Sequence, residues 1–374
     1  MKVYLDNAAT TPLEPSVVKV MTDVIERVHG NPSSIHQAGR KARTIIEDAR
    51  KRVAQHLNAS TGEIFFTSSA TESNNMVLNC AVRDLGITRF ISSPTEHPCV
   101  KNTLSALAKN YDISVVLLPV DERGNVSYEE LERLLEIKDQ PTLVSLMHGN
   151  NEIGTMLDIQ RVSKLCKDHG ALFHTDAVQT VGKFKHDLQE TKIDFLSASG
   201  HKIYGPKGIG IVYINSDNHF EPFIVGGGQE RKMRSGTENI YGIAGFAEAL
   251  DWLVTNREEH RRHITTLREH FKARVAEAGL DITLNGNQEE FFLYNILSIS
   301  IPKTEKTDLI MFNLDIYGIC ASAGSACSSG VEYDSHVLEA IGAPRDRKTI
   351  RLSMSHHNTI EEMDYVIEKL AQVI

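Results

Sequence analysis

The chain has 374 residues, a hydrophobic content of 41% and a formal net charge of −9 at pH 7. This length favours two or three domains, and the acidic balance argues against direct binding of nucleic acid. No apolar run approaches the ~20 residues that a membrane-spanning helix needs, and the first residues carry no export signal. We therefore expect a cytoplasmic protein without a membrane partner.

Short apolar runs alternate with helical patterns from about residue 60 to residue 215. The runs at 113–118 and 143–147 are continuously apolar with polar ends, which is typical of buried parallel strands. Strand and helix alternation of this kind predicts an α/β domain with right-handed crossovers. The expected strands are 63–67, 89–92, 113–118, 143–147, 171–175, 195–198 and 210–214, and the expected helices are 71–84, 97–110, 127–136 and 158–169.

The last third of the chain has a different pattern. A long helical pattern is expected from 241 to about 279, and its charged stretch 257–263, with two histidines, is expected to be a solvated helix face. Strands near 282 and at 296–301 then mix with helices near 306–314 and at 359–373. This mixture predicts a smaller α+β domain.

Lys202 stands in the most informative motif, Ser199-Gly200-His201-Lys202-Ile203-Tyr204-Gly205-Pro206-Lys207-Gly208. A Schiff-base site needs an amine that is held still and a backbone that a flat cofactor can approach, and small residues permit that approach. Ser199 and His201 offer short polar groups that could hold a phosphate beside the amine. The alternative for this motif taken alone is an exposed basic loop.

Further polar groups follow other expected strands, at the edge where open α/β sheets bind ligands. The stretch 67–72 opens a helix and suits an anion, Asp176 could keep a pyridine nitrogen protonated, and His97 offers a ring for stacking. Asn150 and Asn151 could orient ring or substrate oxygens. Each has a structural alternative: a helix cap, a turn former or a buried histidine. The loops at 226–231 and 234–237 could reach a phosphate in a neighbouring subunit.

Together these motifs resemble the class V aminotransferase group of pyridoxal-phosphate enzymes, and within it the cysteine desulfurases. The resemblance rests on Lys202, Ala70-Thr71, Asp176 and Arg234-Ser235-Gly236-Thr237, and it runs from Tyr4-Leu5-Asp6-Asn7-Ala8-Ala9-Thr10-Thr11 to the last helix. It implies the aspartate aminotransferase-like fold of PLP-dependent transferases. A large, mainly parallel sheet domain would cover residues 14–256, and a smaller α+β domain would combine 1–13 with 257–374.

The resemblance also implies roles for single residues around pyridoxal 5′-phosphate. Lys202 would form the Schiff base, with His97 stacked on the ring as an acid–base relay. Substrate would be held near its carboxylate by Asn7, Asn151 and Arg351, since the planar guanidinium of arginine matches a carboxylate. The implied cofactor-binding set is Ala70, Thr71 (phosphate), Asn151, Asp176 (pyridine nitrogen), Gln179 (phenolic oxygen), Ser199, His201 (phosphate), Lys202 and, across a homodimer interface, Thr237.

Cys327 indicates the branch of the family. It lies in the small-residue stretch Ala323-Gly324-Ser325-Ala326-Cys327-Ser328-Ser329-Gly330, which resembles the group with a longer catalytic loop. The implied activity converts L-cysteine to L-alanine and leaves a persulfide on Cys327, from which sulfur passes to an acceptor protein for iron–sulfur cluster assembly or tRNA thiolation. No resident metal is expected, although Cys327 could transiently meet a nascent iron–sulfur cluster. The other cysteines, Cys80, Cys99, Cys166 and Cys320, are expected to be packing residues without disulfides.

Three features depart from the family pattern, and the most conservative is Ser328, which stands where many relatives have threonine. Met354-Ser355-His356-His357 replaces the usual Gly-Arg-containing turn, and the chain ends at Ile374 soon after the last helix, which leaves scaffold binding open. Two other readings of the fold remain. The chemistry could be that of an aminotransferase or a selenocysteine lyase, which would not depend on Cys327 in the same way, and a non-catalytic binding module is disfavoured by the complete residue set.

Overall fold

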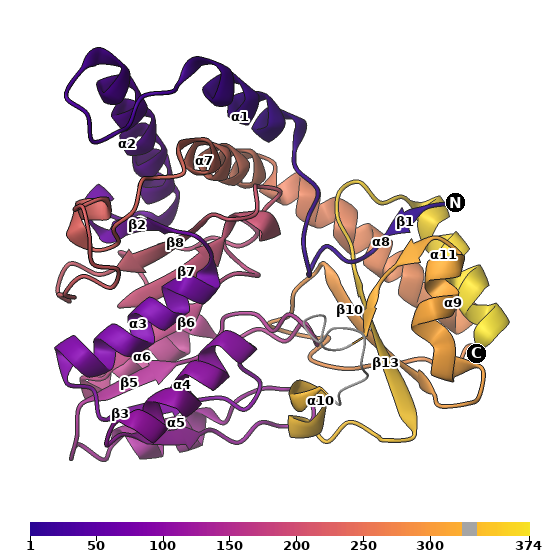
Figure 1. Ribbon diagram of the computed structural model, residues 1–374. Helices are drawn as coiled ribbons and strands as arrows, with labels where there is room; N and C mark the ends of the chain where they lie inside the picture. Colours follow the sequence, from indigo (N-terminus) through magenta and orange to yellow (C-terminus); the bar gives the residue numbers. More distant parts are fainter. Residues whose placement is uncertain (324–334) are drawn as a thin grey trace.

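A seven-stranded sheet forms the centre of the large unit (Figure 1). The computed structural model describes residues 1–323 and 335–374. The sheet order is β2-β8-β7-β6-β5-β3-β4, in which β8 is antiparallel to both neighbours and the pairs from β7 to β4 are parallel. The strands are β2 Ile64–Thr67, β3 Arg89–Ser92, β4 Ser114–Leu117, β5 Thr142–Ser145, β6 Leu172–Asp176, β7 Phe195–Ser199 and β8 Gly210–Ile214.

Helices cover both faces of this sheet, so neighbouring strand residues enter different cores. On β3, Phe90 packs with the helices α3 and α4, whereas Ile91 packs in the core formed with α1, α2 and α7. Full burial on both faces explains why the central strands are apolar without alternation. The helices are α1 Pro15–Arg27, α2 Gln37–Leu57, α3 Ala70–Leu85, α4 Pro98–Asn110, α5 Tyr128–Leu135, α6 Ile159–His169 and α7 Ile240–Thr255.

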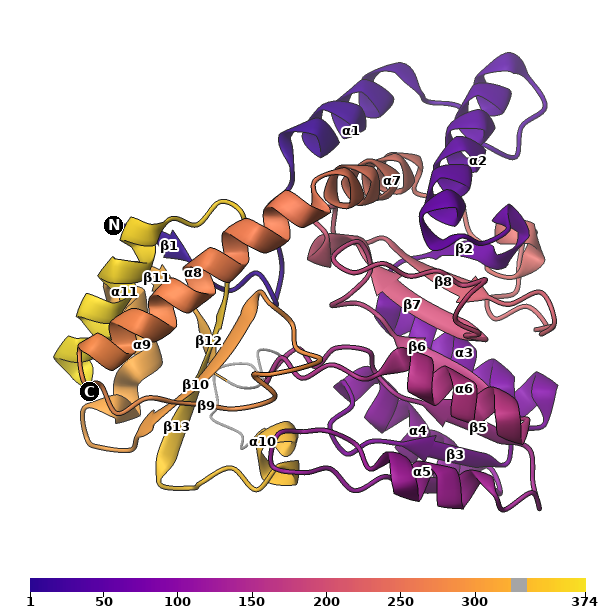
Figure 2. The same cartoon turned by 180° about the vertical axis from the view of Figure 1, so that it is seen from behind.

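The small unit has its own sheet and its own hydrophobic core. Its sheet order is β12-β13-β10-β9, and a separate parallel pair joins β1 to β11 near the amino terminus. Helices α8 and α11 pack against each other along one side of it (Figure 2). The elements are β1 Val3–Tyr4, α8 Arg257–Glu277, β9 Thr283–Leu284, β10 Ile296–Pro302, α9 Ile310–Ile316, β11 Ile319–Cys320, β12 Ser322–Ala323, α10 His336–Ala340, β13 Arg347–Ser353 and α11 Ile360–Val373.

The helical pattern expected from 241 to 279 is confirmed, but the chain forms two helices on either side of Asn256. The Asn256 side chain donates to the Trp252 carbonyl at 2.7 Å, a local bond that competes with continued helix. The solvated face expected at 257–263 is wrong for His260, which is 3% exposed. The cause is tertiary: α8 begins between the two units, and its first turn packs against His356.

The prediction that 113–118 is a buried strand is also wrong. Strand β4 lies at the edge of the large sheet, and Leu117 on it is 50% exposed. An apolar run does not reveal whether a second strand will pair with its outer side. The other expected strands of the large sheet are confirmed to within two residues. In the described parts of the chain, no helix has both the length and the apolar character that crossing a membrane requires.

Candidate active site

Lys202 lies just beyond the carboxyl end of β7, in a tight turn that the chain can form only with small residues. A Cβ atom on Gly205 would come within 2.9 Å of the Gly200 carbonyl oxygen, so a side chain there would force the turn open. The turn directs the Lys202 Nζ to the carbonyl oxygens of Ala8 and Ala9, at 2.6 and 2.7 Å. The amino-terminal segment therefore lies against the lysine, beyond the carboxyl end of β7.

Asp176 ends β6 and is held in one orientation by two hydrogen bonds. Its Oδ2 accepts from Asn74 Nδ2 at 2.7 Å and its Oδ1 from the Val178 amide at 3.1 Å. Asn74 is oriented in turn by His174, whose Nε2 lies 3.2 Å from Asn74 Oδ1. Sequence reasoning missed Asn74; its position one turn into α3, the helix that opens at the same sheet edge, is the signal that could have found it.

His97 belongs to the same cluster. It is the N-cap of α4, and its Nδ1 accepts from the Cys99 amide at 3.2 Å. Burial lowers the pKa of His97; the charge of Asp176 opposes this shift, and that of Lys202 adds to it. Because both charges act on the ring, His97, Asp176 and Lys202 share one site. The ring is held neutral, which suits a stacking surface and a group that exchanges protons.

The first turn of α3 meets the Lys202 turn. The Ala70 amide donates to Ser199 Oγ at 2.8 Å, and Thr71 follows on the exposed side of that turn. His201 Nδ1 lies 3.3 Å from Thr10 Oγ1, and burial together with nearby lysine charges lowers the pKa of His201 to about 4. A helix amino terminus beside several lysines favours an anion.

Two buried amides at this site carry an oxygen without a hydrogen-bond partner among residues 1–323 and 335–374, namely Gln179 Oε1 and Asn7 Oδ1. Their amide nitrogens are occupied, by the carbonyls of Ala8 and Ser353 at 3.0 and 2.8 Å. Lys183 donates to the main-chain carbonyl of Gln179. Burial is the main cause that lowers the pKa of Lys183 to about 7, and the Lys202 charge adds to it. Sequence reasoning missed this second lysine.

Arg351 on β13 brings the small unit to the site. Its guanidinium donates to Asp6 Oδ1 at 2.8 Å and to the Asn151 carbonyl at 2.9 Å. The buried Nε has no hydrogen-bond partner within the described residues. Asn151 thus contributes its carbonyl to the arginine, whereas the sequence suggested its side-chain amide. Asp6 was missed as a holder of Arg351.

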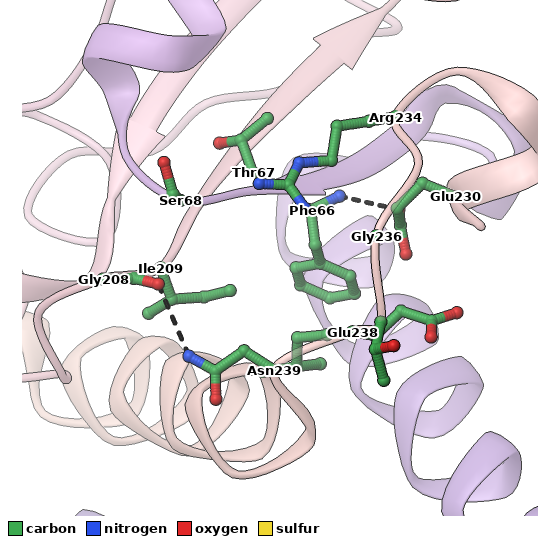
Figure 3. A pocket seen from close by; sticks show the side chains of 12 residues that line it. Phe66, Thr67, Ser68, Gly208, Ile209, Glu230, Arg234, Gly236, Glu238 and Asn239 are labelled. Carbon is green, nitrogen blue, oxygen red and sulfur yellow. Dashed lines mark hydrogen bonds between the residues drawn. The ribbon is translucent and has the colours of Figure 1, made fainter. Parts of the chain in front are cut away.

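Thr237 is not brought to Lys202 by any contact described within this chain. It lines a separate pocket of about 180 Å³ with Ser68, Arg234 and Asn239 (Figure 3). Arg234 is fixed there by Glu72, with its Nε 2.7 Å from Glu72 Oε1. The expected role of Thr237 across a dimer interface stays a prediction.

The cysteines divide into three groups. Cys80 and Cys166 are buried in the cores, as expected. Cys99 is a packing residue only in part, because its Sγ lies 3.0 Å from His97 Nδ1 in the site, and Cys320 is exposed. The packing prediction is therefore wrong for Cys320. Cys327 lies outside the described residues.

The residues present fit pyridoxal phosphate. The cluster offers an oriented carboxylate for a protonated ring nitrogen, a lysine amine, and a helix amino terminus for a phosphate. The Gln179 amide has one end unpartnered among the described residues, as expected of a group that faces a polar ring substituent. A flat, anionic cofactor with a basic ring nitrogen suits this donor set.

Comparisons with known proteins give one consistent family. The family model "Aminotransferase class-V" matches residues 3–366. The curated "Cysteine desulfurase IscS" of Dictyoglomus turgidum is 40% identical, over 100% of this chain and 94% of the relative. The solved "NifS-like protein" has a TM-score of 0.91 at 37% identity, covering 100% and 99% of the two chains. The structure "SspA in complex with cysteine" has a TM-score of 0.81 at 30% identity, covering 96% and 100%.

Proposed function

Because the chain belongs to the aminotransferase class-V family and, within it, to the cysteine desulfurases, we propose that the cluster around Lys202 binds pyridoxal 5′-phosphate and converts L-cysteine to L-alanine. The observation that carries the proposal is the combination at one sheet edge of an oriented Asp176 and a lysine amine, with Arg351 partly unpaired within the described residues. When bound, the cofactor supplies an electron sink that makes the α-proton of the substrate acidic.

Three groups would hold the cofactor. Asp176 would face the ring nitrogen, and its bonds from Asn74 and Val178 hold it in one orientation, so that it needs no reorganisation during the reaction. Ala70, Thr71, Ser199 and His201 receive the phosphate, completed by Thr237 from a second subunit of a homodimer. Gln179 faces the ring oxygen.

The remaining residues act on the substrate. Arg351, with Asn7 and Asn151 beside it, binds the carboxylate, and the Asp6 and Asn151 contacts hold the guanidinium in place for this. Lys202 takes the α-proton at its Nζ. His97, neutral because it is buried, relays a proton between the substrate thiol and the carbon that becomes the methyl group of alanine.

Cys327 receives the sulfur. Its thiolate forms an S–S bond to the substrate sulfur, the carbon–sulfur bond breaks, and the electron pair of that bond stays on the substrate carbon, which is then protonated. A persulfide on Cys327 results. From there sulfur passes to an acceptor protein in the cytoplasm, an iron–sulfur scaffold or a tRNA-thiolation protein. A selenocysteine lyase or aminotransferase activity is the alternative use of the same site.

The experiment that tests this function compares Cys327→Ala with Cys320→Ala in the cofactor-loaded enzyme. Cys320 is exposed, so its replacement controls for the general loss of a reactive thiol. We expect Cys327→Ala to lose persulfide formation and alanine release from L-cysteine, and Cys320→Ala to keep both. Unchanged turnover by Cys327→Ala would favour the alternative chemistry.

The acceptor is identified by sulfur transfer. Enzyme whose Cys327 carries labelled sulfur is mixed with a purified iron–sulfur scaffold or a tRNA-thiolation protein. We expect the label to pass to one of these proteins and to need Cys327. Transfer to small thiols alone would show that no protein acceptor docks at the site.

A further inference from the structure

Three side chains with metal-ligand atoms meet outside the Lys202 cluster, where the two units of the chain join. They are Glu14, just before α1, and His356 and His357, in the connection between β13 and α11. His356 Nε2 lies 2.8 Å and His357 Nε2 3.5 Å from Glu14 Oε1, and the three ligand atoms all lie within 4.8 Å of one another. Figures 1 and 2 both draw the yellow connection after β13 beside the indigo segment that leads into α1. The histidines are the residues that depart from the family pattern.

The Glu14 carboxylate is buried, and one of its oxygens has no hydrogen-bond partner within the described residues. The residue is 4% exposed, and its side chain does not cap α1 although it stands at the N-cap position. Its Oε1 accepts no aligned hydrogen bond from any group in the described residues, despite the imidazole nitrogen 2.8 Å away. A buried acceptor in this condition is costly. The two imidazole nitrogens lie near Glu14 Oε1 without an aligned hydrogen bond to it. This arrangement suits an ion that the oxygen and both nitrogens could bind together.

The surroundings of His356 also fit a ligand. Its Nδ1 lies 2.9 Å from His260 Nε2, and the rings of Tyr204 and Trp252 stand 5.0 and 4.8 Å from its own. An outer partner on the second ring nitrogen is what orients a metal-bound histidine. His357 is 46% exposed at its side chain, which leaves one side open to solvent.

We propose that Glu14, His356 and His357 form a site for a divalent transition-metal ion, Zn²⁺ above all. Two imidazole nitrogens and one carboxylate oxygen are a common zinc donor set, and the fourth position of the tetrahedron would face solvent. Zinc bonds of roughly 2.0–2.2 Å place ligand atoms a little over 3 Å apart, close to the 2.8 and 3.5 Å between Glu14 Oε1 and the two imidazole nitrogens. Mg²⁺ and Ca²⁺ are disfavoured because they prefer oxygen ligands.

The position gives the ion a structural role. Glu14 precedes the first helix of the large unit, whereas His356 and His357 follow β13, the strand that carries Arg351. A bound ion would tie these segments together and so hold the small unit against the large one. The site shares no residue with the proposed desulfurase machinery, so it stands or fails independently of that function.

The test is metal binding by the full-length, cofactor-loaded protein. Equilibrium dialysis against Zn²⁺ should give one tight equivalent, and Zn²⁺ should raise the melting temperature. His357→Ala should weaken this binding by more than the roughly 10- to 100-fold that loss of an outer partner causes, and Glu14→Gln should do the same. His270→Ala is the matched control, because His270 Nε2 also lies 2.9 Å from a carboxylate, that of Asp364, without being among the three residues of this site; its affinity should be unchanged.

A second readout identifies the ligands. Co²⁺ at this site should give the absorption of a four-coordinate ion without thiolate-to-metal charge transfer, which separates it from binding at a cysteine. The proposal is overturned if the parent protein takes up no equivalent, if His357→Ala binds as well as the parent, or if the Co²⁺ spectrum shows a thiolate. Should Glu14→Gln fail to fold, the half-exposed His357→Ala decides alone.

Discussion

Two buried arginines differ in how completely their nitrogens are hydrogen-bonded within the described residues. We call the fully bonded region around Arg50 the closed region and the partly bonded region around Arg351 the open region. Arg50, under β2, is 0% exposed and Arg351, at the edge of the site, is 1% exposed. Every nitrogen of the Arg50 guanidinium is bonded: two to Glu230 at 2.8 Å, one of these also to the Ile64 carbonyl, and the third to Glu47 at 3.1 Å. Glu230 is satisfied further by the Phe66 amide at 2.8 Å (Figure 3).

The Arg351 guanidinium is hydrogen-bonded only in part within the described residues. Its two terminal nitrogens reach Asp6 and the Asn151 carbonyl, and its Nε stays unpaired among the described residues, as do the oxygens of Asn7 and Gln179 nearby. Since an unpaired buried polar group is unfavourable, a concentration of such groups marks a place that a ligand completes. We infer that the Arg50 region has a structural role and that the Arg351 region is a ligand-binding site.

The largest effect should come from Lys202→Ala, which removes the reacting amine from the open region. We expect turnover of L-cysteine to fall at least about 10³-fold, since covalent catalysis needs this group. The melting temperature should change less than that of Arg50→Ala, because the carbonyls that accept from Lys202 Nζ are neutral, whereas Arg50 neutralises a buried carboxylate. Alanine release and thermal unfolding measure the two effects. A Lys202→Ala enzyme with full turnover would contradict the assigned site.

Arg50→Ala tests the closed region. Its removal leaves the Glu230 carboxylate buried without its cation, so we expect a loss of about 3–5 kcal/mol in the free energy of unfolding. Arg133→Ala, which breaks an exposed pair with Glu130 on α5, is the control and should stay within about 1 kcal/mol of the parent. Denaturant titration measures both. Equal effects of the two changes would show that the buried network is not special.

Arg351→Lys should have the opposite effect to Arg50→Ala, with a loss of activity and little loss of stability. Lysine keeps the charge but cannot present a planar fork to a carboxylate, so we expect kcat/KM for L-cysteine to fall roughly 10- to 100-fold, mainly through KM. The free energy of unfolding should change little, because only part of the Arg351 guanidinium is hydrogen-bonded within the described residues. A variant that loses stability but keeps kcat/KM would place Arg351 with Arg50 among the structural residues.

The same contrast explains what could be predicted from the sequence. Asp176, Lys202 and His97 follow strands or open helices, and the ends of parallel strands meet at one sheet edge, so local patterns predicted a shared position that the structure has. Asn74 and Asp6 were missed because their partners, Asp176 and Arg351, lie 102 and 345 residues away. Nothing local distinguishes such an asparagine from any other residue on an amphipathic helix.

The fold class was predicted correctly, and the errors in single elements have the same cause. Strand positions follow from short apolar runs, but the edge position of β4 depends on which strands pair, and the burial of His260 depends on where α8 meets the other unit. The closed Arg50 network was also not predicted from the sequence, since Glu230 lies 180 residues from Arg50, in a loop that was expected to reach a neighbouring subunit. Long-range pairing, not local propensity, decided each case.

Glu152 gives the smallest and most specific test of the open region. It is buried beside Arg351 and bonded to the Ser335 hydroxyl, and burial raises its pKa from 4.5 to about 7, against the opposing effects of Ser335 and Arg351. A raised carboxyl pKa means that the folded state binds the proton more tightly than the unfolded state does. Its contribution is therefore favourable below pH 4.5 and is lost as the pH rises through 7.

Glu152→Gln should remove that dependence. Between pH 5 and pH 8 the parent should lose stability relative to the variant by on the order of 1–3 kcal/mol, since one pKa unit corresponds to about 1.4 kcal/mol. Denaturant titration at several pH values measures the difference, and the exposed Glu258→Gln on α8 is the control, for which the difference should stay flat. In the closed region, the buried Glu230 carboxylate has an arginine nitrogen at 2.8 Å. A flat difference for Glu152→Gln as well would mean that Arg351 keeps this carboxylate ionised, and that the open region is electrostatically as complete as the closed one.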